Sequence, residues 1–231
     1  VHGYFYPTTY GDMDVKPVGL FGCAADFNKD DETLIIDGGD ILQGSAFAYY
    51  CRQVADSPEV IADIMNDCGY DYYTLGNHDF NYGLEYQAAY RSRNNGVCVC
   101  QNITDEAGNT LFPWKLHTMK NGLRVGIVGI VTDYVNIWEK EENLIGIHIT
   151  DPFEAAKNAL AQMKEQTDLT ICIYHGGFEC DLESGETLSQ TTENVGYRIC
   201  KELDFDILLT GHQHMSVPGR DISGTYTVQP C

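Results

Sequence analysis

The feature that most constrains this chain of 231 residues is a regular alternation of short apolar segments with segments of helical periodicity. Most of the apolar segments are rich in Val and Ile on both faces, which is typical of strands in a buried sheet. Asn121-Gly122, between two of them, predicts a tight hairpin, so we expect a mixed sheet. Strands are expected at residues 33–36, 72–75, 97–99, 116–119, 123–131, 169–174, 207–209 and 226–228. The pattern predicts an α/β fold.

Helix signals lie between these strands. Ser57-Pro58 predicts an N-cap followed by proline at the first helical position, and Gly69 predicts the end of that helix. Asp151 and Glu154 predict a capping box at the start of a second helix. The expected inward faces are Val60, Ile61, Ile64, Met65 and Cys68 in the first helix, and Ala155, Ala156, Ala159, Leu160 and Met163 in the second. Further helices are expected around 45–55, 83–93 and 191–203.

The chain is strongly acidic, with 34 acidic and 14 basic residues and a formal net charge of −20. A nucleic-acid groove needs clustered Lys and Arg, so binding to a nucleic-acid duplex is disfavoured. The same charge repels a phosphate substrate unless bound cations reverse its sign locally. A phosphate substrate would therefore require metal ions. The sequence contains no apolar run of the roughly 18 residues that predict a membrane span.

Nine cysteines make an odd number, and no Cys-x-x-Cys pair is present. Cys172 in a strand segment and Cys68 on a helix face are interpreted as small core hydrophobes. Mostly reduced thiols favour a reducing compartment.

Potential metal ligands follow several of the predicted strands. Asp40 follows Gly38-Gly39, and these glycines allow a sharp turn that carries its carboxylate away from the strand end. The alternative is a turn aspartate that binds its own backbone, which is the favoured interpretation for Asp37. The carboxyl ends of strands in an open α/β fold share one edge, where such folds place their sites. We therefore expect a metal-dependent hydrolase.

Three further side chains extend this set. Asn77 and His78 come directly after an apolar strand, where an amide oxygen is a neutral ligand and the adjacent histidine can donate a proton. A polar turn is the alternative for both. His175 ends another apolar strand, where it is either a core histidine or a metal ligand. The two glycines after His175 keep the ligand interpretation open.

His212 and His214 form the strongest pair, because residues i and i+2 of an extended chain face the same side. Gly211 is expected to clear space beside them, and the alternative is an exposed turn. His2 is either a terminal tail residue or part of a strand-turn site. A mixed nitrogen and oxygen donor set favours Mn, Fe, Co or Zn.

At these residues the chain resembles the calcineurin-like metallophosphoesterases, whose signature runs Asp-x-His, Gly-Asp, Gly-Asn-His-Asp/Glu, His and Gly-His-x-His. Within that superfamily it is similar to the 5′-nucleotidase group, which includes 2′,3′-cyclic-nucleotide 2′-phosphodiesterase/3′-nucleotidases. The matching stretches are 39–45, 75–84 and 228–230. The resemblance implies a four-layer sandwich of two mixed β-sheets flanked by helices.

The resemblance also implies the roles of the site residues. Asp40 would bridge two divalent ions. One ion would be held by Asn77, His175 and His212, and the other by His2, His214 and an aspartate that lies outside this chain. His78 would be the histidine that binds no metal and faces the leaving group. Residues 1–231 would form one catalytic domain, truncated at its N-terminus and lacking the group's C-terminal substrate-binding domain.

The substrate is the least constrained expectation. Position 81 is asparagine, where typical 5′-nucleotidases carry an aspartate that orients the catalytic histidine. This departure favours the cyclic-nucleotide branch and leaves the partner of His78 open. The alternatives are a 5′-nucleotidase or UDP-sugar hydrolase with the same centre, or a metal-binding domain with impaired catalysis. A nucleotide or another small phosphoester is the expected substrate, with the parent chain's C-terminal domain as a partner. The group is often exported, so localisation stays open.

Overall fold

The computed structural model describes residues 1–9, 11 and 14–230. The largest sheet of this part is mixed and six-stranded, in the order β11-β12-β10-β9-β7-β6. Its strands are β6 (Lys115–Thr118), β7 (Arg124–Val131), β9 (Leu169–His175), β10 (Ile207–Thr210), β11 (Val217–Ile222) and β12 (Thr225–Gln229). Neighbours among β7, β9, β10 and β12 are parallel, whereas β6 and β11 run antiparallel to the strands beside them. Gly122 has a φ of 93° in the β6–β7 turn, so the expected hairpin and mixed sheet are confirmed.

Two smaller sheets complete the strands. In the first, β1 (Ile36–Asp37), β2 (Tyr72–Tyr73) and β3 (Val97–Cys98) are parallel. This sheet is therefore not mixed, and its strands are shorter than expected. In the second, β4 (Cys100–Asp105) pairs antiparallel with β5 (Thr110–Phe112) and β8 (Ile147–Ile149), none of which was predicted.

Five of the described helices correspond to predicted segments, whereas two short ones, at Leu20–Ala24 and Val135–Trp138, were not predicted. The helices are α1 (Leu20–Ala24), α2 (Ala46–Gln53), α3 (Glu59–Asp67), α4 (Gly83–Arg93), α5 (Val135–Trp138), α6 (Pro152–Met163) and α7 (Gly196–Glu202), with 3-10 turns η1 (Asn77–Phe80) and η2 (Glu141–Asn143). The Asp151 carboxylate caps α6 by accepting from Glu154 N at 2.9 Å, as predicted, and the expected inward face of α6 is buried. Helix α3 begins one residue later than predicted, because Pro58 is its N-cap and not its first helical residue. Val60 is 44% exposed rather than inward.

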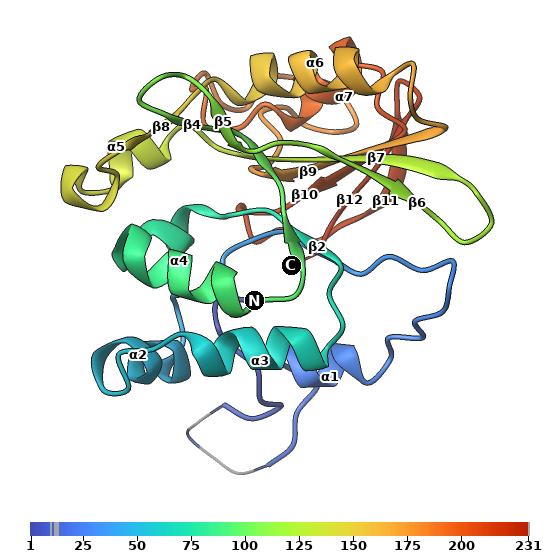
Figure 1. The fold of residues 1–231 in the computed structure, drawn as a ribbon. Helices are drawn as coiled ribbons and strands as arrows, with labels where there is room; N and C mark the ends of the chain where they lie inside the picture. Colours follow the sequence, from blue (N-terminus) through green and yellow to red (C-terminus); the bar gives the residue numbers. More distant parts are fainter. Residues whose placement is uncertain (10, 12–13, 231) are drawn as a thin grey trace.

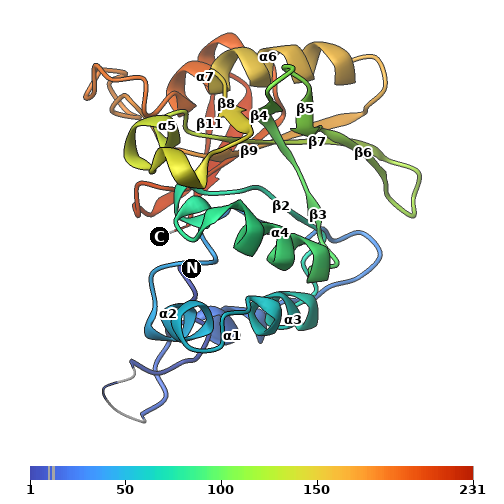
Figure 2. The ribbon, with the colours of Figure 1, turned by 60° about the vertical axis from the view of Figure 1, so that its left-hand side comes forward.

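Four layers stack in this fold. Helices α6 and α7 cover one face of the six-stranded sheet, the β1-β2-β3 sheet lies against its other face, and helices α1 to α4 form the outer layer beyond (Figures 1 and 2). A hydrophobic core fills each space between neighbouring layers: Phe153 and Cys172 lie in one, Ile127 and Tyr72 in the next, and Leu75 in the third. The expected α/β fold is confirmed.

The cysteines of the described residues form no disulfide, and most of them are buried. The eight in the described part of the chain are free thiols, and five of them are buried: Cys51, Cys100, Cys172, Cys180 and Cys200. Cys231 lies outside the described residues. Among the described helices, none has the length and apolarity needed to cross a membrane.

Candidate metal centre and active site

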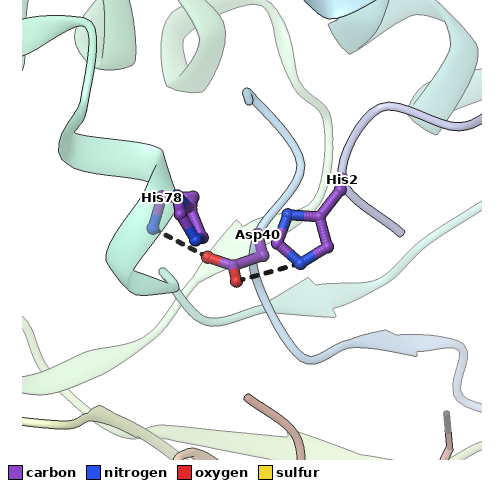
Figure 3. Close-up of side chains that lie close together, drawn as sticks. All are labelled: His2, Asp40 and His78. Atoms are coloured by element: carbon purple, nitrogen blue, oxygen red, sulfur yellow. Dashed lines mark hydrogen bonds and ion pairs between the residues drawn. The ribbon is translucent and has the colours of Figure 1, made fainter. Parts of the chain in front are cut away.

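Strands β1 and β2 belong to the small parallel sheet, and β9 and β10 belong to the parallel part of the six-stranded sheet. The loops that follow the carboxyl ends of these four strands meet at the same edge of both sheets. They bring together six of the seven residues predicted for the site, and the N-terminal segment adds the seventh, His2. Figure 3 shows three of them, with Asp40 between His2 and His78. The seven are His2, Asp40, Asn77, His78, His175, His212 and His214. The expected gathering of strand-end residues is therefore present.

Asp40 lies at the centre of this group and is 3% exposed. Its Oδ2 atom is 3.2 Å from His175 Nε2 and 3.4 Å from His2 Nε2. Its Oδ1 atom accepts a hydrogen bond from His78 N at 2.8 Å. Burial raises the pKa of Asp40, but the neighbouring histidines, His175 first, outweigh burial and hold that pKa below its ordinary value. One carboxylate oxygen thus faces two separate histidines.

Asn77 joins two histidines on one side of Asp40. Its Oδ1 atom is 3.2 Å from His175 Nε2 and 3.0 Å from His212 Nδ1. The opposite ring nitrogens face acceptors, since His175 Nδ1 is 2.7 Å from Gly38 O and His212 Nε2 is 3.0 Å from Glu193 Oε1. With protons on those outer nitrogens, both histidines turn lone pairs towards the Asn77 oxygen. Converging acceptors of this kind fit a cation, and outer-shell acceptors commonly fix the tautomer of metal-binding histidines.

His2 and His214 form the group on the other side. Their Nε2 atoms are 2.9 Å apart, and His2 Nδ1 is 3.1 Å from the Gln43 carbonyl oxygen. Two nitrogens that bind one ion at about 2.0–2.1 Å lie roughly 3 Å apart. The observed spacing is that of two ligands of a single ion, so the residues present fit a second metal position.

The backbone carries strain at the same positions. Six non-glycine residues of the described chain have positive φ, and four of them belong to the predicted ligand set: His2 at 53°, Asp40 at 63°, His212 at 69° and His214 at 52°. Such conformations cost roughly 1–3 kcal/mol each and cluster at functional sites.

Gly76 is required by the close approach of two site residues. A Cβ atom at this position would lie 2.2 Å from Asp40 Oδ1 and 2.6 Å from His175 Cε1, which is closer than real contacts allow. Gly211 is different, because a Cβ atom there would come no closer than 3.8 Å to His175 Nδ1. The expectation that Gly211 clears space for the site is wrong.

Asp79 holds the loops that carry the ligands. Its buried carboxylate accepts four backbone N–H groups at 2.8–3.0 Å: Oδ2 accepts from Asp40 and Gly76, and Oδ1 accepts from Ile41 and Leu42. Burial, with the negative charge of Asp40, raises the pKa of Asp79, and three of these N–H groups oppose that rise. Asp79 therefore has a structural role.

Asp37 makes the local turn contact that was favoured for it. Its Oδ1 accepts from Gly39 N at 3.3 Å, and its Oδ2 has no hydrogen-bond partner among the described residues.

A cavity of about 420 Å³ opens beside His78. His78 Nδ1 is 2.7 Å from Asn81 Oδ1, and Asn81 Nδ2 donates to Glu139 Oε2 at 2.6 Å. The Trp138 ring stacks on His212, with centroids 5.4 Å apart. The lining consists of Asn77, His78, Asn81, Val135, Trp138, Glu139, Glu193 and His212.

Sequence reasoning left the partner of His78 open and missed Glu139 and Glu193. Both lie in irregular segments of a chain with 34 acidic residues, and Glu139 is closely followed by Glu141 and Glu142, so no local pattern marks either residue.

The chain is similar to known proteins in sequence and in fold. The calcineurin-like phosphoesterase family matches residues 20–216. The chain is 30% identical over 93% of its length to the 2′,3′-cyclic-nucleotide 2′-phosphodiesterase/3′-nucleotidase of Yersinia enterocolitica. It is 29% identical over 94% of its length to the 5′-nucleotidase of Vibrio cholerae. Because it covers 35% and 39% of these two proteins, it spans a little over a third of their length.

A solved structure shows the same fold. The crystal structure of a Staphylococcus aureus protein assigned as a 5′-nucleotidase superposes with a TM-score of 0.91 and 34% sequence identity. The match covers 99% of this chain and 46% of that one. The resemblance stated from the motifs is confirmed.

Proposed function

Because the chain belongs to the calcineurin-like phosphoesterase family, we propose that it is the catalytic domain of a nucleotide phosphoesterase that uses two divalent metal ions. Among such activities we favour that of a 2′,3′-cyclic-nucleotide 2′-phosphodiesterase/3′-nucleotidase, the name carried by the Yersinia enterocolitica relative. The observation that carries the proposal is the position of Asp40. Its Oδ2 atom lies within 3.4 Å of a histidine from each of two groups, as a bridging carboxylate requires.

The two groups divide the ligands between two ions. Asn77, His175 and His212 would hold one ion, and His2 and His214 would hold the other. Nitrogen and oxygen donors without a thiol suit Mn, Zn, Co or Fe. When bound, the two ions would supply Lewis acidity, activation of the attacking water and neutralisation of phosphoryl charge.

His78 supplies the proton chemistry in this proposal. It lines the cavity beside the ligand group, and its Nδ1 faces Asn81. That contact leaves Nε2 to donate a proton to the leaving oxygen. The proton passes from Nε2 to the oxygen as the phosphorus–oxygen bond breaks, and the ring keeps its hydrogen on Nδ1. Positioned proton transfer is typically worth about 10²–10⁴-fold in rate.

Other residues of the chain prepare this step. Asp79 fixes the backbone on both sides of Asp40, and Trp138 gives the cavity an apolar wall. We propose that a C-terminal domain of the parent chain contributes to nucleoside recognition, since this chain covers 35% of the Yersinia relative.

The first test combines metal analysis with a substrate panel. Protein prepared with manganese or zinc should bind close to two ions and hydrolyse 2′,3′-cyclic AMP and 3′-AMP faster than 5′-AMP. Preference for 5′-AMP, or for a UDP-sugar, would support one of the alternative substrates. Bound metal without hydrolysis of any of these, or of bis(p-nitrophenyl) phosphate, would make the chain a binding domain.

A second test separates the role of His78 from that of a ligand. His78 belongs to a close group with His2 and Asp40 whose donor atoms lie within 4.8 Å of one another. The His78→Asn variant should lose at least tenfold in kcat and keep its metal content. Loss of an ion from this variant would instead make His78 a ligand. His148→Asn, which changes an exposed histidine of β8 that pairs with Thr104 of β4, is the matched control.

A further inference from the structure

We infer that Glu139 is a positioning residue for His78, acting through the side-chain amide of Asn81. This role rests on the proposed function of His78 as proton donor, which it deepens. The three side chains form a continuous chain of contacts, with His78 Nδ1 at 2.7 Å from Asn81 Oδ1 and Asn81 Nδ2 at 2.6 Å from Glu139 Oε2. All three side chains line the same cavity.

The direction of these hydrogen bonds follows from the chemistry of the end group. A carboxylate accepts hydrogen bonds and donates none, so the Asn81 atom that faces Glu139 is the NH₂ group. The carbonyl oxygen of the same amide must then face His78, and His78 Nδ1 must carry the hydrogen. Glu139 thus determines which end of the Asn81 side-chain amide, the oxygen or the NH₂ group, faces the His78 imidazole.

Glu139 is itself held in place. Its Oε1 atom accepts from Asn143 Nδ2 at 2.9 Å and from Lys140 N at 2.8 Å. Asn143 Nδ2 also donates to the backbone oxygen of Asn81 at 3.3 Å, which ties the two segments together. With Oε1 engaged in this way, Oε2 remains for Asn81. The carboxylate is half-buried, so its rotamers are restricted by these contacts.

An asparagine at position 81 needs such a partner, whereas an aspartate would not. Both oxygens of an aspartate accept, so either orientation serves a protonated Nδ1. The two ends of an asparagine differ, and a reversed amide would present NH₂ to Nδ1. That arrangement requires a lone pair on Nδ1 and therefore excludes a ring with hydrogens on both nitrogens. Asn81 and Glu139 together perform the task of one carboxylate.

The decisive variants replace a hydrogen-bond acceptor with a donor, or a donor with an acceptor, and leave the shape of the side chain unchanged. Glu139→Gln can donate or accept, so it no longer specifies the orientation of the Asn81 amide. Its kcat should fall about tenfold or more for 3′-AMP, whose leaving oxygen needs a proton. For bis(p-nitrophenyl) phosphate, whose leaving group needs none, kcat should stay within about twofold, because general acid catalysis acts only where a proton is transferred. KM and metal content should be unchanged. Glu142→Gln, on the exposed side of the same segment, is the control.

A compensating pair of changes tests whether the two residues act as a unit. Asn81→Asp alone would place two carboxylates at the 2.6 Å contact and should impair 3′-AMP hydrolysis. Asn81→Asp combined with Glu139→Gln should recover activity. The NH₂ group of the new glutamine can donate to one oxygen of the new aspartate, and the other oxygen of that aspartate can accept from His78. Additive losses in the double variant would overturn the inference.

A measurement that needs no turnover keeps this inference separate from the proposed function. In zinc-loaded protein labelled with ¹⁵N-histidine, His78 should carry its hydrogen on Nδ1, and Glu139→Gln should produce a mixture of tautomers. If no phosphoester is hydrolysed, the proposed function fails and the tautomer still tests Glu139. If His78 has the same tautomer and the same 3′-AMP turnover in Glu139→Gln as in the unchanged protein, Glu139 does not position it.

Discussion

Asp79→Asn is the substitution with the clearest structural consequence. Each oxygen of the Asp79 carboxylate accepts two backbone N–H groups, from Asp40 and Gly76 at Oδ2 and from Ile41 and Leu42 at Oδ1. An asparagine can present an oxygen to only one of these pairs. In either orientation its NH₂ group faces two buried N–H donors, and both of those donors lose their partner.

The magnitude follows from this count. A hydrogen bond to a charged group contributes about 1.5–3 kcal/mol, so the loss of two costs about 3–6 kcal/mol. A domain of ordinary stability has about 5–15 kcal/mol in total. The substitution should therefore remove a large part of the free energy of unfolding, although it changes one oxygen to an NH₂ group. The loop that holds Asp40 at a φ of 63° should also relax.

Urea unfolding at pH 8 with EDTA measures this loss without a metal contribution. Asp206→Asn is the matched control, because Asp206 receives both of its bonds from Thr170 at the single oxygen Oδ2. An asparagine there can keep its carbonyl oxygen in that place, so we expect a loss of about 1 kcal/mol. If Asp79→Asn loses no more stability than Asp206→Asn, the four-bond account of Asp79 is wrong.

Three further predictions concern metal, packing and pH. Removal of metal with EDTA should lower Tm, because an ion present at 100 times its Kd stabilises the folded state by about 2.7 kcal/mol; an unchanged Tm would argue against ions in the native centre. Gly76→Ala should reduce bound metal measured by mass spectrometry, since its Cβ would lie 2.2 Å from Asp40 Oδ1; Gly22→Ala, where φ is likewise not positive and no atom lies within 4 Å of the added Cβ, is the control. Burial raises the pKa of Asp37 above its ordinary value, so the folded state retains a proton that the unfolded state releases. The contribution of Asp37 to the free energy of unfolding is complete below the pKa that Asp37 has in the unfolded state. It declines as pH rises through the pKa that Asp37 has in the folded state. Asp37→Asn should therefore flatten the decline in urea midpoint between pH 5 and 8 in EDTA, and an unchanged slope would show that Asp37 is not its source.

The central strands were predictable because their periodicity is local. Strands β7, β9 and β10 lie within or close to the expected segments, and each is apolar over most of its length. The missed strands lack that signal. β11 contains Pro218 and Gly219 and lies at the edge of its sheet, where proline is tolerated. β4 includes Gln101 and Asn102, and both hydrogen bonds that the Asn102 Nδ2 atom donates go to distant segments, to the carbonyl oxygens of Val131 and Thr150.

Local sequence determined the donor types of the proposed centre, because all of them except His2 lie at or just after the end of a strand that its own neighbours specify. Tertiary structure alone decided how those donors are oriented. Asn81 and Glu139 are 58 residues apart, and His212 and Glu193 are 19 residues apart. Hydrogen-bond direction depends on which acceptor lies against each ring nitrogen, and only the folded chain brings those acceptors into contact. Residue types at strand ends therefore indicated a metal phosphoesterase, whereas the hydrogen-bond direction at His78, the proposed proton donor, is a property of the fold.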